Sequence, residues 1–398
     1  TLFRSNTTEH TFQADYTTPI GKIHTLEAGA KYILRDNSSE DDRYEQASAT
    51  QADYEFDNDH SSHYKHQNDI LAAYLGYGLK VKKISGRLGV RYEHTKQEVK
   101  YLLGKGDNFD KNFDDLVPSA SIGYKLTDMS NLRFGYNMRI YRPGIWYLNP
   151  YVNNADPQNI SFGNPNLDSE KSNNINLNYS MFAQKFSINA SATYTFVNNS
   201  IEQYTFIDPE NPGVFQTTYG NIGKKQSTGL FVYANWNPVP LFRIYMNGGM
   251  DYTDLKSEKN DMANSGFSGR IFAGTQFNFP LDFRVNIQGG YFSPWIQLQG
   301  KGSPFYFTGI SVNKDFLKKK LSVQLSFQNP FWKRMKMENT TSDDTFFRRE
   351  INYRTMRMLM VSVSYRFGTL KDAIKKVKRG ISNDDMKSGG SGGGEQQM

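Results

Sequence analysis

Hydrophobic and polar residues alternate along almost the whole chain. The clearest example is SINASATYTF at 187–196, in which every second residue is apolar. The same period of two recurs in FRVNIQGGYF at 283–292, KLSVQLSFQ at 320–328 and MLMVSVSYRF at 358–367. Successive side chains of a β-strand point to opposite faces, so this period predicts strands and does not fit helices.

The alternation predicts fifteen strands and two kinds of connection between them. The strands are predicted near 9–18, 23–35, 66–80, 84–97, 116–126, 130–141, 172–183, 186–198, 214–236, 241–255, 263–279, 283–298, 304–314, 320–337 and 348–367. Short turns near 19–22, 80–84, 126–130, 183–185, 237–240, 279–282 and 315–319 alternate with longer polar loops at 36–65, 97–115, 142–171, 199–213, 256–262, 299–303 and 338–347. This strict alternation is typical of an all-β transmembrane antiparallel barrel with short periplasmic turns and long extracellular loops. A soluble sandwich or propeller does not require short and long connections to alternate.

The composition of the polar faces supports a water-filled barrel interior. These faces are rich in Asn, Gln, Ser, Gly and Arg, whereas a face that meets bulk water is usually rich in Lys and Glu. Mean hydropathy is −0.66, and no run approaches eighteen apolar residues, so the sequence predicts no transmembrane helix. Aromatic residues make up 14% of the chain, which is unlike a disordered protein.

An odd number of strands has a consequence for closure. With fifteen antiparallel strands, the first and last run in the same direction and would have to pair in parallel. Single-chain bacterial barrels have an even number of antiparallel strands. Either the count is wrong by one, or the chain is part of a larger barrel, and we favour the second interpretation.

Other functional classes find little support in the sequence. The chain has no cysteine and a net charge of +7, without a basic and aromatic cluster typical of nucleic-acid binding. It contains no G-x-S-x-G, H-E-x-x-H or Gly-rich phosphate loop, so we expect no enzyme and no cofactor. The first ten residues contain no signal peptide.

Three segments carry motifs of one known family. The first is RPGIWYLNP at 142–150 followed by GNPNLDSEKSNN at 163–174, with an NP-x-L-x-x-E-x-S element made of Asn164, Pro165, Leu167, Glu170 and Ser172. The second is the N-x-G strand start in 219–238, and the third is the close SVSYRFG with a basic, Gly-rich tail. Together these segments resemble the TonB-dependent outer-membrane receptors, and in particular the outer-membrane β-barrel family of Bacteroidota.

The resemblance implies a specific architecture and function. The family's barrel has 22 strands, so residues 1–368 would be strands 8–22, without the plug and the first strands. It implies energy-coupled uptake of a scarce nutrient, such as a siderophore, haem, an oligosaccharide or a peptide. The implied partners are outer-membrane lipid and lipopolysaccharide, an upstream plug, the TonB complex and a surface lipoprotein. A passive porin, a structural barrel and a component of a secretion or assembly machine are the alternatives.

The irregular segment after residue 141 supplies the candidate site. It is rich in prolines and aromatics and lies on the extracellular side by the order of the turns. We expect it to fold back into the barrel mouth, where irregular backbone meets water or protein instead of lipid. The ligand- or plug-facing candidates are Tyr141, Arg142, Trp146, Tyr147, Asn149 and Tyr151.

Two weaker candidates concern charged groups near the N-terminus. The loop 36–65 is strongly acidic and is either a cation-binding segment or a solvated surface loop. His60, His63 and His66 lie three residues apart in the same stretch, which suggests metal or haem contact on a loop.

Basic residues elsewhere have two interpretations each. The arginines predicted on polar strand faces are either ligand- or plug-facing or paired within the wall: Arg133, Arg139, Arg284, Arg357 and Arg366. The tail 369–398 is basic, then Gly/Ser-rich, and is expected to be a flexible periplasmic extension that is either solvated or in contact with anionic lipid.

Overall fold

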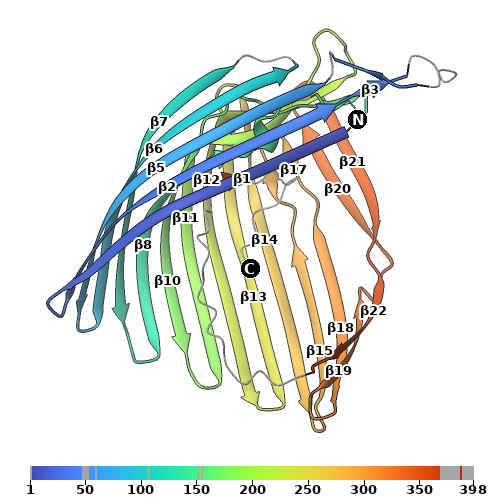
Figure 1. Ribbon diagram of the computed structural model, residues 1–398. Helices are drawn as coiled ribbons and strands as arrows, with labels where there is room; N and C mark the ends of the chain where they lie inside the picture. The colour runs from blue at the N-terminus through green and yellow to red at the C-terminus, as the bar shows by residue number, and fades with distance from the viewer. Residues whose placement is uncertain are drawn as a thin grey trace.

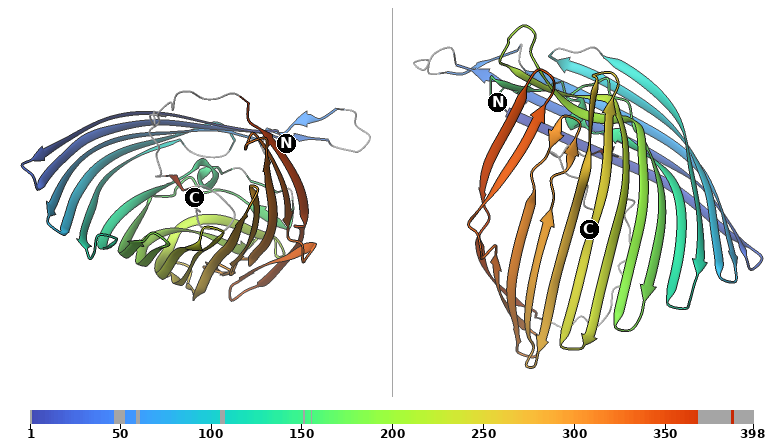
Figure 2. Two further views of the ribbon diagram at one scale, coloured as in Figure 1. Left: turned by 90° about the horizontal axis from the view of Figure 1, so that it is seen from below. Right: turned by 180° about the vertical axis from the view of Figure 1, so that it is seen from behind.

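The computed structural model describes residues 2–46, 53–58, 61–104, 108–150, 152–154, 156–367 and 386–387. Fifteen strands form one curved antiparallel wall around a lumen (Figures 1 and 2). They are β1 (Leu2–Ile20), β2 (His24–Asp42), β5 (Ser62–Val81), β6 (Ile84–Leu103), β7 (Phe109–Lys125), β8 (Ser130–Pro143), β10 (Glu170–Phe182), β11 (Phe186–Ile207), β12 (Phe215–Val239), β13 (Phe242–Ser257), β14 (Met262–Phe279), β15 (Phe283–Phe292), β18 (Phe305–Phe316), β19 (Leu321–Gln328) and β22 (Met358–Tyr365). The predicted count of fifteen is confirmed.

Each wall strand pairs with the next in the chain, from β1–β2 to β19–β22. Among the described residues, β1 pairs only with β2 and β22 only with β19, so no β1–β22 pair closes the wall. The wall carries apolar side chains outward, such as Leu75, Leu88 and Leu116, each more than half exposed. Exposed aliphatic residues in this band are what a lipid-facing surface requires.

The inner face of the wall is polar, as the alternation predicts. On β10, Asn176 donates to Asn174 at 3.0 Å, and Asn178 donates to Asn176 at 2.6 Å. Asn174 in turn donates to Thr195 on β11. Side-chain amides at every second position thus bond along and across the strands, which satisfies polar groups at the lumen surface.

Several strands are longer than the sequence indicated. The predicted loops 36–65 and 97–115 are partly strand, because β2 continues to Asp42, β5 begins at Ser62, β6 reaches Leu103 and β7 begins at Phe109. These extensions have polar residues on both faces, so the apolar–polar period fades while the backbone ladder continues. A period-based prediction therefore ends these strands too early.

The last two predicted strands are each interrupted. Four further strands form a separate sheet at one end of the wall: β16 (Ile296–Gln297), β17 (Gly300–Lys301), β20 (Arg334–Ser342) and β21 (Phe347–Thr355). The predicted loop 338–347 is thus mostly part of the β20–β21 hairpin. Arg357 lies between β21 and β22, and Arg366 lies just after β22, so neither is on a strand as predicted.

The wall separates between β7 and β8. Their pairing ends at Ser119 opposite Asn137, whereas β7 continues to pair with β6 as far as Phe109. Pro118 lies at the point of separation and has no N–H to donate to β8. Above it, Lys171 of β10 forms an ion pair with Asp115 of β7 at 2.5 Å. Side-chain ion pairing thus replaces the backbone ladder there.

Two residues of the tail are described. Met386–Lys387 (β23) pairs in parallel with Arg142–Pro143 at the end of β8. Arg142–Pro143 is the end of β8 farthest from the short turns, and the flexible periplasmic tail stays a prediction. The rest of the predicted tail, 369–385 and 388–398, lies outside the described residues. Among the described residues, no helix is long and apolar enough to cross a membrane.

Candidate functional site: the lumenal crossover

Residues 144–169 connect β8 to β10, and the part of them that the structure describes folds back inside the curve of the wall (Figure 2). We call them the lumenal crossover. It contains a single helical turn, α1 (Ile145–Leu148), and a short strand, β9 (Asn159–Ser161), that pairs in parallel with β12 at Phe215. The expectation that this irregular segment returns into the barrel mouth is confirmed.

A small apolar core attaches the crossover to the wall. Leu148 is 0% exposed and Leu167 is 1% exposed, and they pack with Tyr64, Val99 and Ile201 of three wall strands. These five side chains are thus shielded from the water of the lumen. Burial of such side chains stabilises the docked arrangement by about 1.5–3 kcal/mol each.

Arg142, at the end of β8, is a buried cation. Its Nη2 lies 2.7 Å from Glu93 Oε2 and 2.9 Å from Thr95 Oγ1, both on β6. Arg142 is 4% exposed and Glu93 is 7% exposed, so the pair is screened very little by water. The contact ties the end of β8 to the inner face of β6, across the region where β7 and β8 separate.

Asn149 and Gly163 form a second attachment. The Asn149 side-chain amide donates to Ser39 at 3.1 Å and to Asp41 at 3.3 Å, both on β2. The Asn149 carbonyl oxygen accepts from the Gly163 N–H at 2.8 Å. A Cβ at position 163 would lie 2.3 Å from that oxygen, so only glycine permits this approach.

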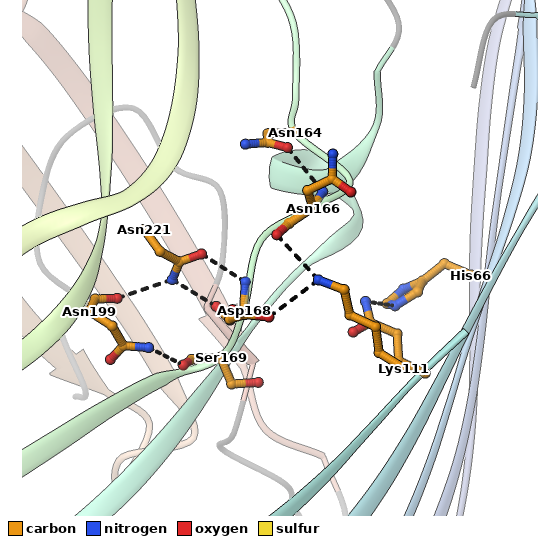
Figure 3. A network of polar contacts seen from close by, with 9 residues as sticks. His66, Lys111, Asn164, Asn166, Asp168, Ser169, Asn199 and Asn221 are labelled. Carbon is orange, nitrogen blue, oxygen red and sulfur yellow. Dashed lines mark hydrogen bonds and ion pairs between the residues drawn. The ribbon is translucent and has the colours of Figure 1, made fainter. Parts of the chain in front are cut away.

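The element that follows Gly163 is held by a polar network, shown in Figure 3. Asn164 donates to the Tyr219 carbonyl at 2.8 Å. Asn221 accepts from the Asp168 N–H and donates to the Asp168 carbonyl. Lys111 forms an ion pair with Asp168 at 3.3 Å. The motif residues therefore anchor the return of the chain into β10, as Glu170 also does by accepting from the Ile201 N–H at 2.5 Å.

The structure divides the predicted candidates into anchors and exposed groups. Arg142 fixes the end of β8 where the crossover starts, and Tyr147 and Asn149 attach the crossover to the wall. Trp146 is 61% exposed, and Tyr141 lies beside Arg139 in a polar pocket of about 300 Å³. Tyr151 lies outside the described residues. Exposed groups are therefore better placed than buried ones to meet a ligand.

The three histidines do not form one cluster. His63 and His66 lie on β5 and not on a loop as expected, and their spacing of three puts them on opposite faces of the strand. His63 contacts Asp42 at 2.8 Å, and His66 is buried between Asn37 and Gln97. His60 lies outside the described residues. Among the described residues, no three His, Asp or Glu side chains are grouped so as to hold a metal.

Some charged groups of the other candidates have protein partners. Arg43 in the acidic segment pairs with Glu45 and Asp57. Arg284 pairs with Asp315 at 2.9 Å, in agreement with pairing within the wall. In the crossover itself, the Asn159 amide and the Gln158 N–H bond to the Asp156 carboxylate, and these hydrogen bonds hold its pKa below the usual range.

Sequence reasoning missed the wall residues that receive the crossover. Glu93, Ser39 and Asn221 lie 49, 110 and 53 residues from their partners Arg142, Asn149 and Asp168. On their own strands they are ordinary polar positions of a lumen-facing row. No local pattern distinguishes them, because their role depends on register between distant strands.

The fold and the lumenal crossover together define an outer-membrane β-barrel with part of its interior filled by its own chain. The chain belongs to the outer membrane protein beta-barrel family, whose model matches residues 1–365. No curated protein sequence matches the chain.

Solved structures share the fold. The ferric yersiniabactin uptake receptor FyuA from Yersinia pestis has a TM-score of 0.66 and 15% identity, over 92% of this chain and 55% of that one. The ferric citrate transporter FecA has a TM-score of 0.64 and 16% identity, over 92% and 55%. The copper transporter OprC has a TM-score of 0.64 and 13% identity, over 92% and 58%. The chain thus spans little more than half the length of these proteins.

Proposed function

We propose that this chain is the barrel part of a TonB-dependent outer-membrane receptor that takes up a scarce nutrient with energy supplied from the inner membrane. The observation that carries the proposal is the docked lumenal crossover, which places the family's NP-x-L-x-x-E element inside a wall shared in fold with FyuA, FecA and OprC. A plug, TonB and a surface lipoprotein are the partners proposed for the whole protein.

The crossover weighs against a passive porin. A porin needs a continuous aqueous passage, whereas here a segment of 26 residues (144–169) occupies the mouth and is fixed by an apolar core and a buried ion pair. The printed names of the solved relatives concern iron complexes and copper. An iron chelate or a metal ion is therefore the first ligand class to test, before haem, oligosaccharides and peptides.

The experiment is a binding screen on the native protein extracted from outer membranes. The probes are ferric citrate, a ferric catecholate, Cu²⁺, haem, a maltooligosaccharide and a mixed peptide library. Saturable binding of one probe that is lost in Trp146→Ala supports the proposal. A steady, unselective conductance of the same preparation in planar bilayers, with no saturable binding, would support the porin alternative and reject the receptor.

A further inference from the structure

Five aromatic rings follow one another along the inner face of the wall between β13 and β18. The distances between ring centroids are 5.7 Å for Tyr245–Phe272 and 5.9 Å each for Phe272–Phe307, Phe305–Phe307 and Phe292–Phe305. Tyr245 lies close to the short turn before β13, whereas Phe292 and Phe305 lie at the far ends of β15 and β18. We call these rings the aromatic track. Because short turns face the periplasm in such barrels, the track runs from the periplasmic end toward the mouth.

The rings of the track face the lumen. Ile271 and Tyr291 lie opposite each other on β14 and β15 and are 47% and 46% exposed on the outer face. Successive side chains of a strand point to opposite faces, so Phe272 and Phe292 point inward. All five rings of the track are partly exposed, and a molecule in the lumen therefore has access to them.

Two glycines let the rings lie against the wall. Gly290 lies between Phe272 and Phe307 in the register of β14, β15 and β18. A Cβ at position 290 would lie 2.5, 2.9 and 3.3 Å from three atoms of the Phe307 ring, and a Cβ at Gly274 would lie 2.5 Å from Tyr245 Cζ. The rings thus cover glycine backbone on one side and leave the other side open to the lumen.

Neutral amide side chains accompany the rings. The Tyr245 hydroxyl donates to Gln288 at 3.2 Å and to Asn286 at 3.3 Å, and it reaches them across Gly274. The Asn286 amide donates to Gln288 at 3.2 Å. The hydroxyl and the amides retain further hydrogen-bonding capacity, because each amide has two N–H groups and an oxygen with two lone pairs.

The track carries no charge along its length. Residues 245–249, 272–276, 286–292 and 305–311 are described throughout and contain no Asp, Glu, Lys or Arg. The nearest charged inner positions are Arg243 and Arg284 toward the short turns and Arg270 toward the mouth. An anionic ferric chelate needs cations to compensate its charge, and this surface does not supply them.

Aromatic faces beside neutral amides match the chemistry of an uncharged sugar. The face of an aromatic ring carries negative partial charge, so it attracts the C–H groups on the flat side of a sugar ring. Amide side chains donate to and accept from the hydroxyls at the edge of the same ring. A row of similar rings about 6 Å apart offers this contact repeatedly to a chain of sugars.

We propose that the aromatic track is a binding path for an uncharged oligosaccharide along the β13–β18 side of the lumen. The inference rests on the proposed function and deepens it, since it names a ligand class and the side of the lumen on which the ligand passes. It relies on this chain's own lining and not on the ligands of the solved relatives.

The test is equilibrium binding of maltohexaose, cellohexaose, xylohexaose and mannohexaose to the full protein purified from its outer membrane. Ferric citrate is the charged comparison. We expect saturable binding of at least one hexasaccharide. Phe307→Leu keeps an apolar side chain over Gly290 but removes the ring, and should weaken this binding about tenfold, equal to ~1.4 kcal/mol. Phe307→Tyr keeps the ring and should retain the affinity, as should Tyr291→Leu on the outer face.

Several results would overturn the proposal. They are the absence of saturable binding by all four hexasaccharides, equal weakening by Phe307→Leu and Tyr291→Leu, and binding of ferric citrate that depends on the Phe307 ring. A folded-state gel shift on heating shows whether Phe307→Leu forms a barrel, and Phe305→Leu replaces it in the same comparison if it does not.

Failure of the inference is distinct from failure of the proposed function. Energy-coupled uptake of a ferric chelate without saccharide binding would reject the track and leave the receptor standing. Saccharide binding that requires the Phe307 ring, together with purely passive flux, would reject the receptor and leave the track standing.

Discussion

The Arg142 guanidinium lies 2.7 Å from the Glu93 carboxylate, and the pair joins the end of β8 to β6 without any backbone pairing between these strands. Arg91 reaches the other oxygen of Glu93 at 2.5 Å. One carboxylate therefore bonds two arginines beside the separation of β7 from β8. This contact fixes to the wall the end of β8 from which the crossover starts.

Replacing Arg142 by alanine should destabilise the barrel by about 3 kcal/mol, because Glu93 stays buried with only Arg91 left to compensate it. The measurement is the temperature at which the folded band disappears in a gel-mobility assay. Arg284→Ala is the matched control, since its pair with Asp315 is 46% exposed on the arginine side and such pairs contribute about 0–1 kcal/mol. Equal losses in the two variants would contradict this account.

Truncation of the crossover core should release the crossover while leaving the wall intact. Leu148→Ala removes a side chain that is 0% exposed, at a cost of about 2–5 kcal/mol. We expect faster chymotryptic cleavage within 144–169 and unchanged cleavage elsewhere. Leu116→Ala on the outer face, where the side chain is 62% exposed, opens no internal cavity and should leave the cleavage rate at the wild-type value.

Gly163→Ala should also weaken the attachment of the crossover to the wall, in this case by a steric clash. The added methyl would lie 2.3 Å from the Asn149 carbonyl oxygen and 2.7 Å from that of Tyr147, so the backbone must move apart. Overpacking of this kind costs about 1–3 kcal/mol. Gly86→Ala is the control, because its methyl would meet nothing nearer than 3.9 Å. Thermal stability of the two variants decides the point, and a stable Gly163→Ala protein would show that the close approach is not required.

Trp146 separates ligand contact from folding. Its side chain is 61% exposed on the crossover, so Trp146→Ala should change stability by no more than about 0.5 kcal/mol. If it contacts the ligand, affinity for the probe found in the binding screen should fall by about 30-fold, equal to ~2 kcal/mol. Trp236→Ala, 48% exposed on β12, should keep full affinity. Unchanged binding by Trp146→Ala would remove it from the site.

The alternation predicted strands correctly where one face is apolar and the other polar. It missed strand residues where both faces are polar. The stretch 187–196 of β11 keeps its period because one face meets lipid and the other water. Residues 36–42 of β2 are polar on both faces, so only their ladder with β1 and β5 shows that they are strand.

The sequence predicted that the segment after residue 141 folds inward, but not which of its side chains are buried and which are exposed. Proline and aromatic content marked 142–151 as special, yet burial reverses the roles of neighbours: Tyr147 is 9% exposed and Trp146 61%. A single turn of helix decides which ring points to the wall. The partners of Arg142 and Asn149 depend on the register of β2 and β6, and that information is not local in the chain.

The most direct test of the central claim is the energy dependence of uptake in whole cells that carry the full protein. Accumulation of the probe identified by binding is measured with and without an uncoupler of the inner-membrane proton gradient, against a strain that lacks the protein. The account predicts accumulation above the external concentration that the uncoupler abolishes. Flux that continues unchanged with the uncoupler and only equalises the two concentrations would contradict it and identify a passive channel.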